Sequence, residues 1–184
     1  MGGINYTEKV LKRCERLNLK TGVWQPITSM KECRKNAAAC TMTSDTIYVF
    51  GGTSNTQTMN SIEQFSITTS KWTQLKVRLP FPLSFMSVMK MNETKIIVLG
   101  GSRKAAAVPK AEDTNSSLNS GKTSSVYLFD LIDPNFTRLN DLSEPFISMY
   151  PPFYDQRRGT VTLVNEDCNS QKPTVLTYSI LDQL

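Results

Sequence analysis

The sequence predicts an all-β chain of about 13 short strands, built from a repeated unit of four strands with little or no helix. The first observation is a pair of adjacent glycines after a short apolar run. TIYVFGG ends at Gly51–Gly52, and KIIVLGG ends 49 residues later at Gly100–Gly101. The second is an aromatic residue that recurs downstream in each unit, at Trp24, Trp72 and Phe136, with an apolar residue three positions later each time. Trp24 and Trp72 are 48 residues apart, which agrees with the interval between the glycines.

Residues 1–27 are expected to supply the last two strands of a first unit. The chain opens with MGG, which places a Gly pair 49 residues before Gly51–Gly52. The segment RLNLKTGVWQPI, 16–27, then reads as two strands around a KTG turn at 20–22.

Residues 28–76 are expected to form a complete unit. Its four strands are predicted at 36–43, 46–51, 61–67 and 71–76. The second of these is apolar on both faces, as in a buried strand, and the third alternates apolar and polar residues, as in a half-buried strand. The turn residues TSD separate the first two strands.

Residues 77–140 repeat the pattern with an insertion at 102–123, and 141–184 form a partial fourth unit. Helix-favouring residues occur only at 102–113, where Pro109 interrupts them. In the fourth unit TVTLVNE replaces the glycines with Asn165–Glu166, and VLTYSI matches IEQFSI of the second unit.

Composition limits the chemistry. The chain has 184 residues, a net charge of +5 and no histidine, so an imidazole base, a Ser-His or Cys-His pair and a His-based metal site are excluded. The four cysteines form no C-x-x-C motif and are expected to be free thiols in a reducing compartment. No signal core or membrane-length apolar run is present in these residues. We expect a cytoplasmic protein without cofactor or metal.

A period near 50 residues, four strands per unit, an apolar run into Gly-Gly and a later aromatic landmark together resemble the kelch repeat. The residues that carry the resemblance are Gly51, Gly52, Gly100, Gly101, Trp24, Trp72 and Phe136. The resemblance implies a β-propeller in which each unit is a blade, the glycines allow a sharp turn, and the aromatic residue packs against a neighbouring blade. These landmarks are expected to be structural rather than catalytic.

Kelch propellers close with about five to seven blades, whereas this chain holds three to four. The resemblance therefore implies an incomplete arc: 1–27 a partial blade, 28–76 a blade, 77–140 a blade with the insertion, and 141–184 a partial blade. We expect a piece of a longer propeller protein, or an arc whose open edges associate with another chain.

The longer loops of such an arc emerge at one end, where kelch proteins commonly bind partner proteins. The candidate partner-binding residues are Arg34, Lys35, Phe81, Arg103 and Lys104. For the basic loop around Arg34 the alternative is a solvated surface loop, and Leu83 at the matching place of the next unit speaks against a ring of arginines. For Phe81 the alternative is packing between blades.

The expected function is a non-catalytic protein-interaction module, with no nucleic-acid or membrane partner. The alternative is a propeller-type enzyme fragment with a carboxylate and arginine site. A copper oxidase of the galactose-oxidase type is excluded, since the sequence lacks the histidine ligands.

Overall fold

The computed structural model describes residues 1–103, 121–148, 150–165 and 174–180. These residues form 13 strands in four antiparallel sheets and contain no helix, which confirms the predicted all-β architecture. Consequently, nothing in the described part of the chain is a helix of the length and apolarity needed to cross a membrane.

Each sheet is a simple meander in which consecutive strands pair. The first sheet holds β1 (Cys14–Asn18) and β2 (Val23–Ile27). The second holds β3 (Ala38–Thr41), β4 (Thr46–Phe50), β5 (Ile62–Ser66) and β6 (Lys71–Gln74). The third holds β7 (Ser87–Lys90), β8 (Lys95–Leu99), β9 (Val126–Asp130) and β10 (Asn135–Arg138). The fourth holds β11 (Phe153–Asp155), β12 (Thr160–Asn165) and β13 (Thr174–Ser179).

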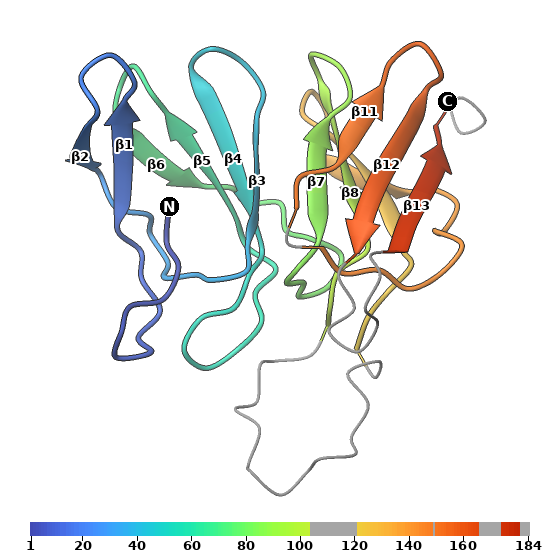
Figure 1. Ribbon diagram of the computed structural model, residues 1–184, viewed down its shortest axis with the longest axis horizontal. Coiled ribbons are helices and arrows are strands. Elements are labelled where there is room, and N and C mark those ends of the chain that lie inside the picture. The colour runs from blue at the N-terminus through green and yellow to red at the C-terminus, as the bar shows by residue number, and fades with distance from the viewer. Residues whose placement is uncertain (104–120, 149, 166–173, 181–184) are drawn as a thin grey trace, which may run out of the picture.

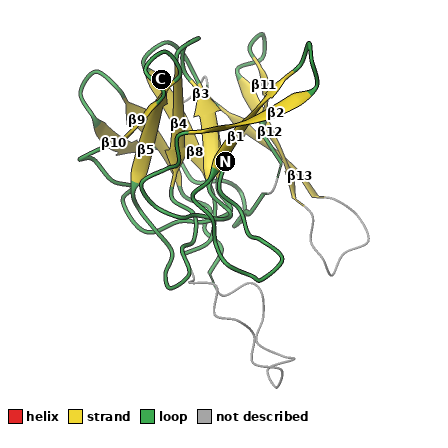
Figure 2. Cartoon of the chain, turned by 90° about the vertical axis from the view of Figure 1, so that its left-hand side faces the viewer, coloured by secondary structure: helices red, strands yellow, loops and turns green. Residues whose placement is uncertain are grey.

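The four sheets stand side by side with their strands running roughly up and down in Figure 1. The short hairpin turns β1–β2, β3–β4, β7–β8 and β11–β12 lie at the upper end, and the longer connections lie at the lower end. Figure 2 shows the same division in the turned view, with the long loops gathered below the strands. β3 and β7, the first strands of two neighbouring sheets, contact each other. The chain therefore presents a hairpin end and a loop end.

Apolar side chains between neighbouring sheets form the core. One cluster lies between the second and third sheets and includes Phe50, Ile62, Ile96 and Phe129, all fully buried. Two further clusters join the first sheet to the second and the third sheet to the fourth. The second and third sheets have a neighbour on each side and bury both of their faces, which explains the two-sided apolar character of β4 and β8.

The Gly-Gly pairs make the joint between one sheet and the next. Gly51 and Gly52 both have positive φ, at 52° and 92°, and Gly100 and Gly101 repeat this conformation at 62° and 105°. The Gly52 amide donates a 2.8 Å hydrogen bond to the carbonyl of Leu83, which leads into the third sheet. A Cβ on Gly51 would collide with that same carbonyl oxygen. The glycines are thus required by a left-handed turn and by close approach of the next sheet.

The aromatic landmark on β6 packs as the sequence predicts. The Trp72 ring lies 4.8 Å from the Phe65 ring, is 3% exposed, and donates through Nε1 to the carbonyl of Thr28 at 2.8 Å. Phe136 on β10 stacks on Phe129 at 4.7 Å in the same way.

Trp24, the matching residue on β2, departs from the expected packing, since it is 62% exposed. The reason is positional: the side of the first sheet that carries Trp24 has no described sheet against it, whereas Trp72 faces residues of the first sheet.

Candidate functional site

The loop end is built from connections that cross from one sheet to the next. The amide of Arg34 donates to the carbonyl of Leu11 at 3.0 Å, and the amide of Leu83 donates to the carbonyl of Met59 at 3.0 Å. These are the same bond in consecutive repeats, since Arg34 and Leu83 are 49 residues apart. Each entry loop is therefore fastened to the long loop of the preceding sheet, so the loops form one continuous surface.

Arg34 does not lie at that surface. Its side chain is 1% exposed, and Nη2 donates to Glu63 Oε1 at 2.7 Å while Nη1 donates to the carbonyl of Gly51 at 2.7 Å. The fully buried Glu63 carboxylate also accepts the amides of Lys31 and Glu32, at 2.6 and 3.1 Å. The expectation that Arg34 grips a partner therefore needs correction: its guanidinium holds the entry loop onto the second sheet.

The partly exposed Glu32 extends this network toward the surface. Its Oε2 accepts hydrogen bonds from Arg34 Nη2 at 3.2 Å and from Gln74 Nε2 at 3.1 Å, and it also accepts the hydroxyl of Ser61. The loop 31–34 is thus bonded to β5, to β6 and to the turn that follows Gly51–Gly52.

Two other predicted partner-binding residues come together. The Arg103 guanidinium lies over the Phe81 ring, 3.5 Å from its centroid, and Phe81 meets Tyr127 edge-on at 5.7 Å. Phe81 is partly buried, so it combines the two readings of the sequence: one side packs against the third sheet, and another is covered by a cation. Lys104 lies outside the described residues.

Lys35 is fixed through its backbone. Its amide and carbonyl exchange hydrogen bonds of 2.9 and 2.8 Å with Thr53 in the long loop of the second sheet, and its side chain is partly exposed. The next residue, Asn36, accepts at its carbonyl a 2.9 Å hydrogen bond from the amide of Phe85, the matching residue of the third sheet.

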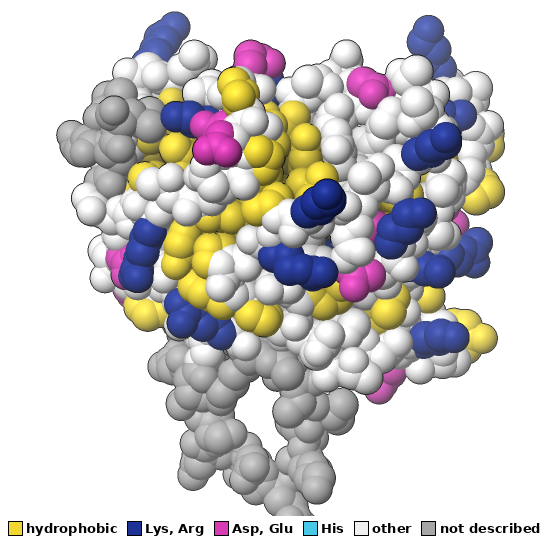
Figure 3. Space-filling model, turned by 180° about the vertical axis from the view of Figure 1, so that it is seen from behind, with side chains coloured by type: hydrophobic (Ala, Val, Ile, Leu, Met, Phe, Trp, Pro, Cys, Tyr) yellow, Lys and Arg dark blue, Asp and Glu magenta, His cyan; other side chains and the backbone are white. Residues whose placement is uncertain are grey.

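A groove of about 560 Å³ lies at the loop end of the first two sheets. We call it the basic groove, since four exposed cations line it: Lys9, Lys12, Arg13 and Lys31. Buried Val10 and Met59 also line it, and the Asn55 side chain accepts the Val10 amide at 3.0 Å, which joins its two walls. Seen from behind, Lys and Arg side chains gather on the half of the molecule that belongs to these sheets (Figure 3).

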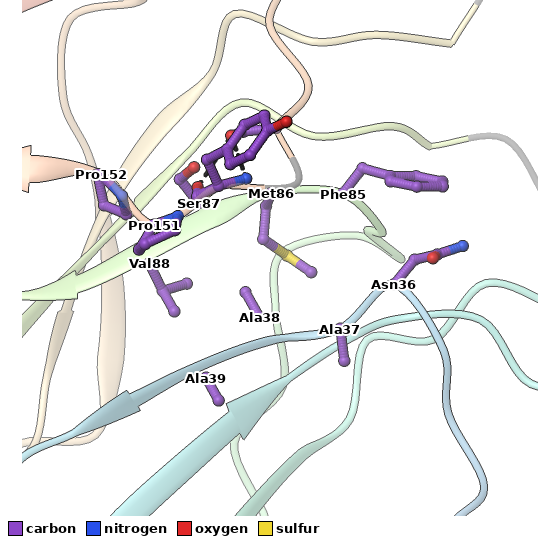
Figure 4. A pocket seen from close by; sticks show the side chains of 12 residues that line it. Asn36, Ala37, Ala38, Ala39, Phe85, Met86, Ser87, Val88, Pro151 and Pro152 are labelled. Atoms are coloured by element: carbon purple, nitrogen blue, oxygen red, sulfur yellow. Dashed lines mark hydrogen bonds between the residues drawn. The ribbon is translucent and has the colours of Figure 1, made fainter. Parts of the chain in front are cut away.

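A second groove of about 310 Å³ runs between β3, β7 and the segment that leads into β11. Its lining contains no Lys, Arg, Asp, Glu or Cys; it is formed mainly by small and apolar residues such as Ala38, Met86, Val88 and Pro151. Figure 4 shows Met86 extending toward Ala37 and Ala38 on the neighbouring sheet. Its polar side chains are those of Asn36, Ser87, Ser148 and Tyr150, and no carboxylate, amine, guanidinium or thiol lines it.

The described cysteines, Cys14, Cys33 and Cys40, are free thiols, and burial lowers the reactivity of Cys14 and Cys40. Burial raises the pKa of Cys40 to about 12 and raises the pKa of Cys14. A thiol protonated at neutral pH is a poor nucleophile and a poor metal ligand. In the part of the chain that the structure describes, no three His, Cys, Asp or Glu side chains converge as metal ligands would.

Sequence reasoning missed Glu63 and three cations of the basic groove, Lys9, Lys12 and Arg13. Glu63 carried a signal: it is the one charged residue in IEQFSI, at a position where the third sheet has Tyr127. Lys9, Lys12 and Arg13 lie in a segment that was assigned only to a partial first unit. Alignment of that segment with the second unit shows that the second unit has uncharged residues at these positions.

Comparison with known proteins shows which family model the chain matches. Residues 1–151 match the model described as the KLHDC2/KLHL20/DRC7 Kelch-repeats domain. No curated protein gives a significant match to the chain. Domains of the matched type typically bind protein partners. The match covers most of the 184 residues, and it agrees with the four sheets, the glycine joints and the aromatic landmarks. The chain belongs to the kelch-repeat family.

Proposed function

We propose that the chain is a non-catalytic module that binds a partner protein with its loop end. The observation that carries the proposal is the fastening of consecutive entry loops to one another by repeated hydrogen bonds, Arg34 to Leu11 and Leu83 to Met59. A surface held in this way on a rigid stack of sheets is ordered before a partner arrives, which lowers the entropic cost of binding.

The residues proposed to touch the partner are Lys35, Phe81, Arg103 and Lys104. Phe81 and Arg103 make the better supported pair, because an aromatic ring and a guanidinium in contact are the residue types that dominate interface energetics. Lys104 is retained from the sequence alone.

The lining of the groove in Figure 4 supports a binding rather than a catalytic role. General acid–base catalysis most often uses carboxylates, imidazoles or amines with tuned pKa values in a cleft, and none of these groups lines this groove. The alternative of a carboxylate and arginine site loses its best candidate pair, since Arg34 and Glu63 are buried against each other.

We further propose that the chain is one part of a larger propeller. The support is the exposure of apolar side chains on the outer sides of the first and fourth sheets: Trp24 is 62% exposed, and Phe153 and Val175 are 69% and 58% exposed. In the repeat, the place of Trp24 corresponds to that of Trp72, which a neighbouring sheet covers. Further blades, or another chain, would cover these sides in the functional assembly. Free thiols at Cys14, Cys33 and Cys40 support a cytoplasmic location.

Affinity capture with paired variants tests the binding role. The immobilised chain is exposed to cell extract, and retained proteins are identified by mass spectrometry. A triple variant at the loop end, Lys35→Glu, Phe81→Ala and Arg103→Glu, is expected to lose the partner. A variant at the hairpin end, Lys20→Glu with Arg157→Glu, is expected to retain it. Loss only in the hairpin-end variant would contradict the proposal, provided that both variants melt like the original chain.

A further inference from the structure

The cations of the basic groove are not required by the fold. Backbone hydrogen bonds give the equivalent positions in the next sheet: the carbonyl of Lys12 accepts the amide of Met30, and the carbonyl of Asn60 accepts the amide of Leu79. By the same correspondence Lys9, Arg13 and Lys31 match Gln57, Ser61 and Pro80. The second sheet builds the same joint with four uncharged residues, so the four charges belong to this groove and not to the repeat.

The four cations also lack partners that would neutralise them. Of these four cations, only Arg13 forms an ion pair within the described ranges, an exposed contact of 3.9 Å with Glu15. The carboxylate that lines the groove, Glu32, is engaged by Arg34, Ser61 and Gln74. Four exposed cations around one groove give it a positive potential that attracts an anion.

The floor of the groove is apolar and fixed. Val10 and Met59 are 4% and 6% exposed, and partly buried Leu11 and Cys33 lie beside them. Asn55 holds the floor in place, since it accepts the Val10 amide at 3.0 Å and donates to the Cys33 sulfur at 3.8 Å. No aromatic side chain lines the groove, so it offers no platform on which nucleic-acid bases would stack.

We propose that the basic groove binds an acidic peptide segment of the partner protein, with carboxylates on Lys9, Lys12, Arg13 and Lys31 and one apolar side chain of the segment over Val10 and Met59. This inference rests on the proposed function and names the chemistry of the partner. Carboxylates spaced along an extended segment satisfy cations on both walls of a groove, and an apolar side chain between them covers the floor.

The test is fluorescence anisotropy with a fluorescein-labelled peptide of glutamates around a single leucine. The matched probe has glutamine in place of every glutamate. The acidic peptide is expected to bind the chain at least about tenfold more tightly than the glutamine peptide, and its affinity is expected to fall as salt is raised. Equal affinity for the two peptides, or no binding of the acidic one at low salt, overturns the proposal.

Charge reversal locates the site. The variant Lys12→Glu with Lys31→Glu is expected to weaken the acidic peptide at least about tenfold, while Lys20→Glu with Lys71→Glu, the same charge change at the hairpin end, leaves it within about twofold. All four side chains are exposed, so both variants keep the fold. Equal loss in both would show that net charge alone attracts the peptide, and tighter binding of a poly-dT oligonucleotide than of the acidic peptide would favour nucleic acid; either result overturns the proposal.

The captured partner separates this inference from the proposed function. If Lys12→Glu with Lys31→Glu releases the partner, the acidic segment belongs to it and both proposals stand. If that variant retains the partner while the variant at Phe81 and Arg103 loses it, binding at the loop end stands and the proposal of an acidic segment in the basic groove is wrong.

Discussion

The guanidinium of Arg34 and the carboxylate of Glu63 lie 2.7 Å apart, with 1% and 0% of the two side chains exposed. In the next repeat the same two places are occupied by Leu83 and Tyr127, which are both buried in the apolar cluster between the second and third sheets. One joint between sheets is thus held by an ion pair and the other by apolar contact.

Breaking the ion pair from one side is expected to be costly. Arg34→Leu leaves the Glu63 carboxylate buried without its cation, and removal of one partner of a buried pair costs about 3–5 kcal/mol of unfolding free energy. The double variant Arg34→Leu with Glu63→Tyr copies the neighbouring joint and is expected to be more stable than the sum of the single effects by about 2–3 kcal/mol. Urea unfolding of the four proteins measures this coupling.

The tyrosine of the double variant cannot replace every contact of Glu63. Glu63 receives the amides of Lys31 and Glu32, which the tyrosine would leave without that acceptor, so full recovery is not expected. Simple additivity of the two single variants would show that the guanidinium and the carboxylate do not stabilise each other.

The two tryptophans provide a test of which sides of the sheets are covered in solution. Trp72 is 3% exposed and hydrogen-bonded to Thr28, so Trp72→Ala is expected to cost about 3–5 kcal/mol. Trp24 is 62% exposed, so Trp24→Ala is expected to cost less than about 1 kcal/mol. Chemical denaturation of each variant checks the difference. Equal costs would contradict the expectation and would mean that another surface covers Trp24 in solution.

The fold was predictable because its determinants are local and repeated. Gly51–Gly52 and Gly100–Gly101 mark strand ends directly, and an aromatic residue on an outer strand is visible at Trp72. The candidate site was less predictable, since its contacts join loops far apart in the chain. Arg34 is 29 residues from Glu63, and nothing beside it in the sequence indicates that its charge is buried. The basic groove likewise forms only where the loop that contains Lys9 folds beside the loop that contains Lys31, and these loops are separated in the sequence.

Comparison of alanine substitutions at Gly51 and Gly22 is expected to separate the cost of a left-handed backbone conformation from the cost of a steric clash. Gly51→Ala places a side chain in a left-handed conformation and also drives its Cβ into the Leu83 carbonyl. Gly22, in the β1–β2 turn, has a φ of 68° but no atom within 4 Å of the added Cβ, so Gly22→Ala carries the conformational cost alone, about 1–2 kcal/mol. Thermal unfolding should show the larger loss for Gly51→Ala; equal losses would mean that the joint yields to a methyl group.

Ser87 on β7 is expected to tolerate loss of its hydroxyl. Its Oγ is buried and has no hydrogen-bond partner among the described residues, and the equivalent residue of the second sheet is Ala38. Ser87→Ala is therefore expected to be neutral or to stabilise by up to about 1 kcal/mol. Ser61→Ala is the contrast, since the Ser61 hydroxyl contacts both Arg34 and Glu32 and its loss should destabilise. Clear destabilisation by Ser87→Ala, measured by urea unfolding, would show that its hydroxyl is satisfied.

Alkaline pH is expected to weaken the fold through Cys40. Burial raises the pKa of this thiol from 9.0 to about 12, so the folded chain keeps the proton after an unfolded chain has lost it. The stabilisation is complete below pH 9 and is lost as pH rises from 9 toward 12, at up to about 1.4 kcal/mol per pH unit. Urea unfolding between pH 8 and 9 measures the slope, where tyrosines with the ordinary pKa of 10.0 are still mostly protonated.

Removal of the thiol identifies its share of that slope. Cys40→Ala cannot titrate, so its unfolding free energy is expected to fall less steeply with pH than that of the original chain. Thr41→Ala, an exposed neighbour on the same strand, is expected to keep the original slope. Burial also raises the pKa of Cys14, so a residual fall remains in Cys40→Ala. Identical slopes in the original chain and in Cys40→Ala would show that the Cys40 thiol ionises as readily folded as unfolded, and hence that β3 opens to solvent at this position.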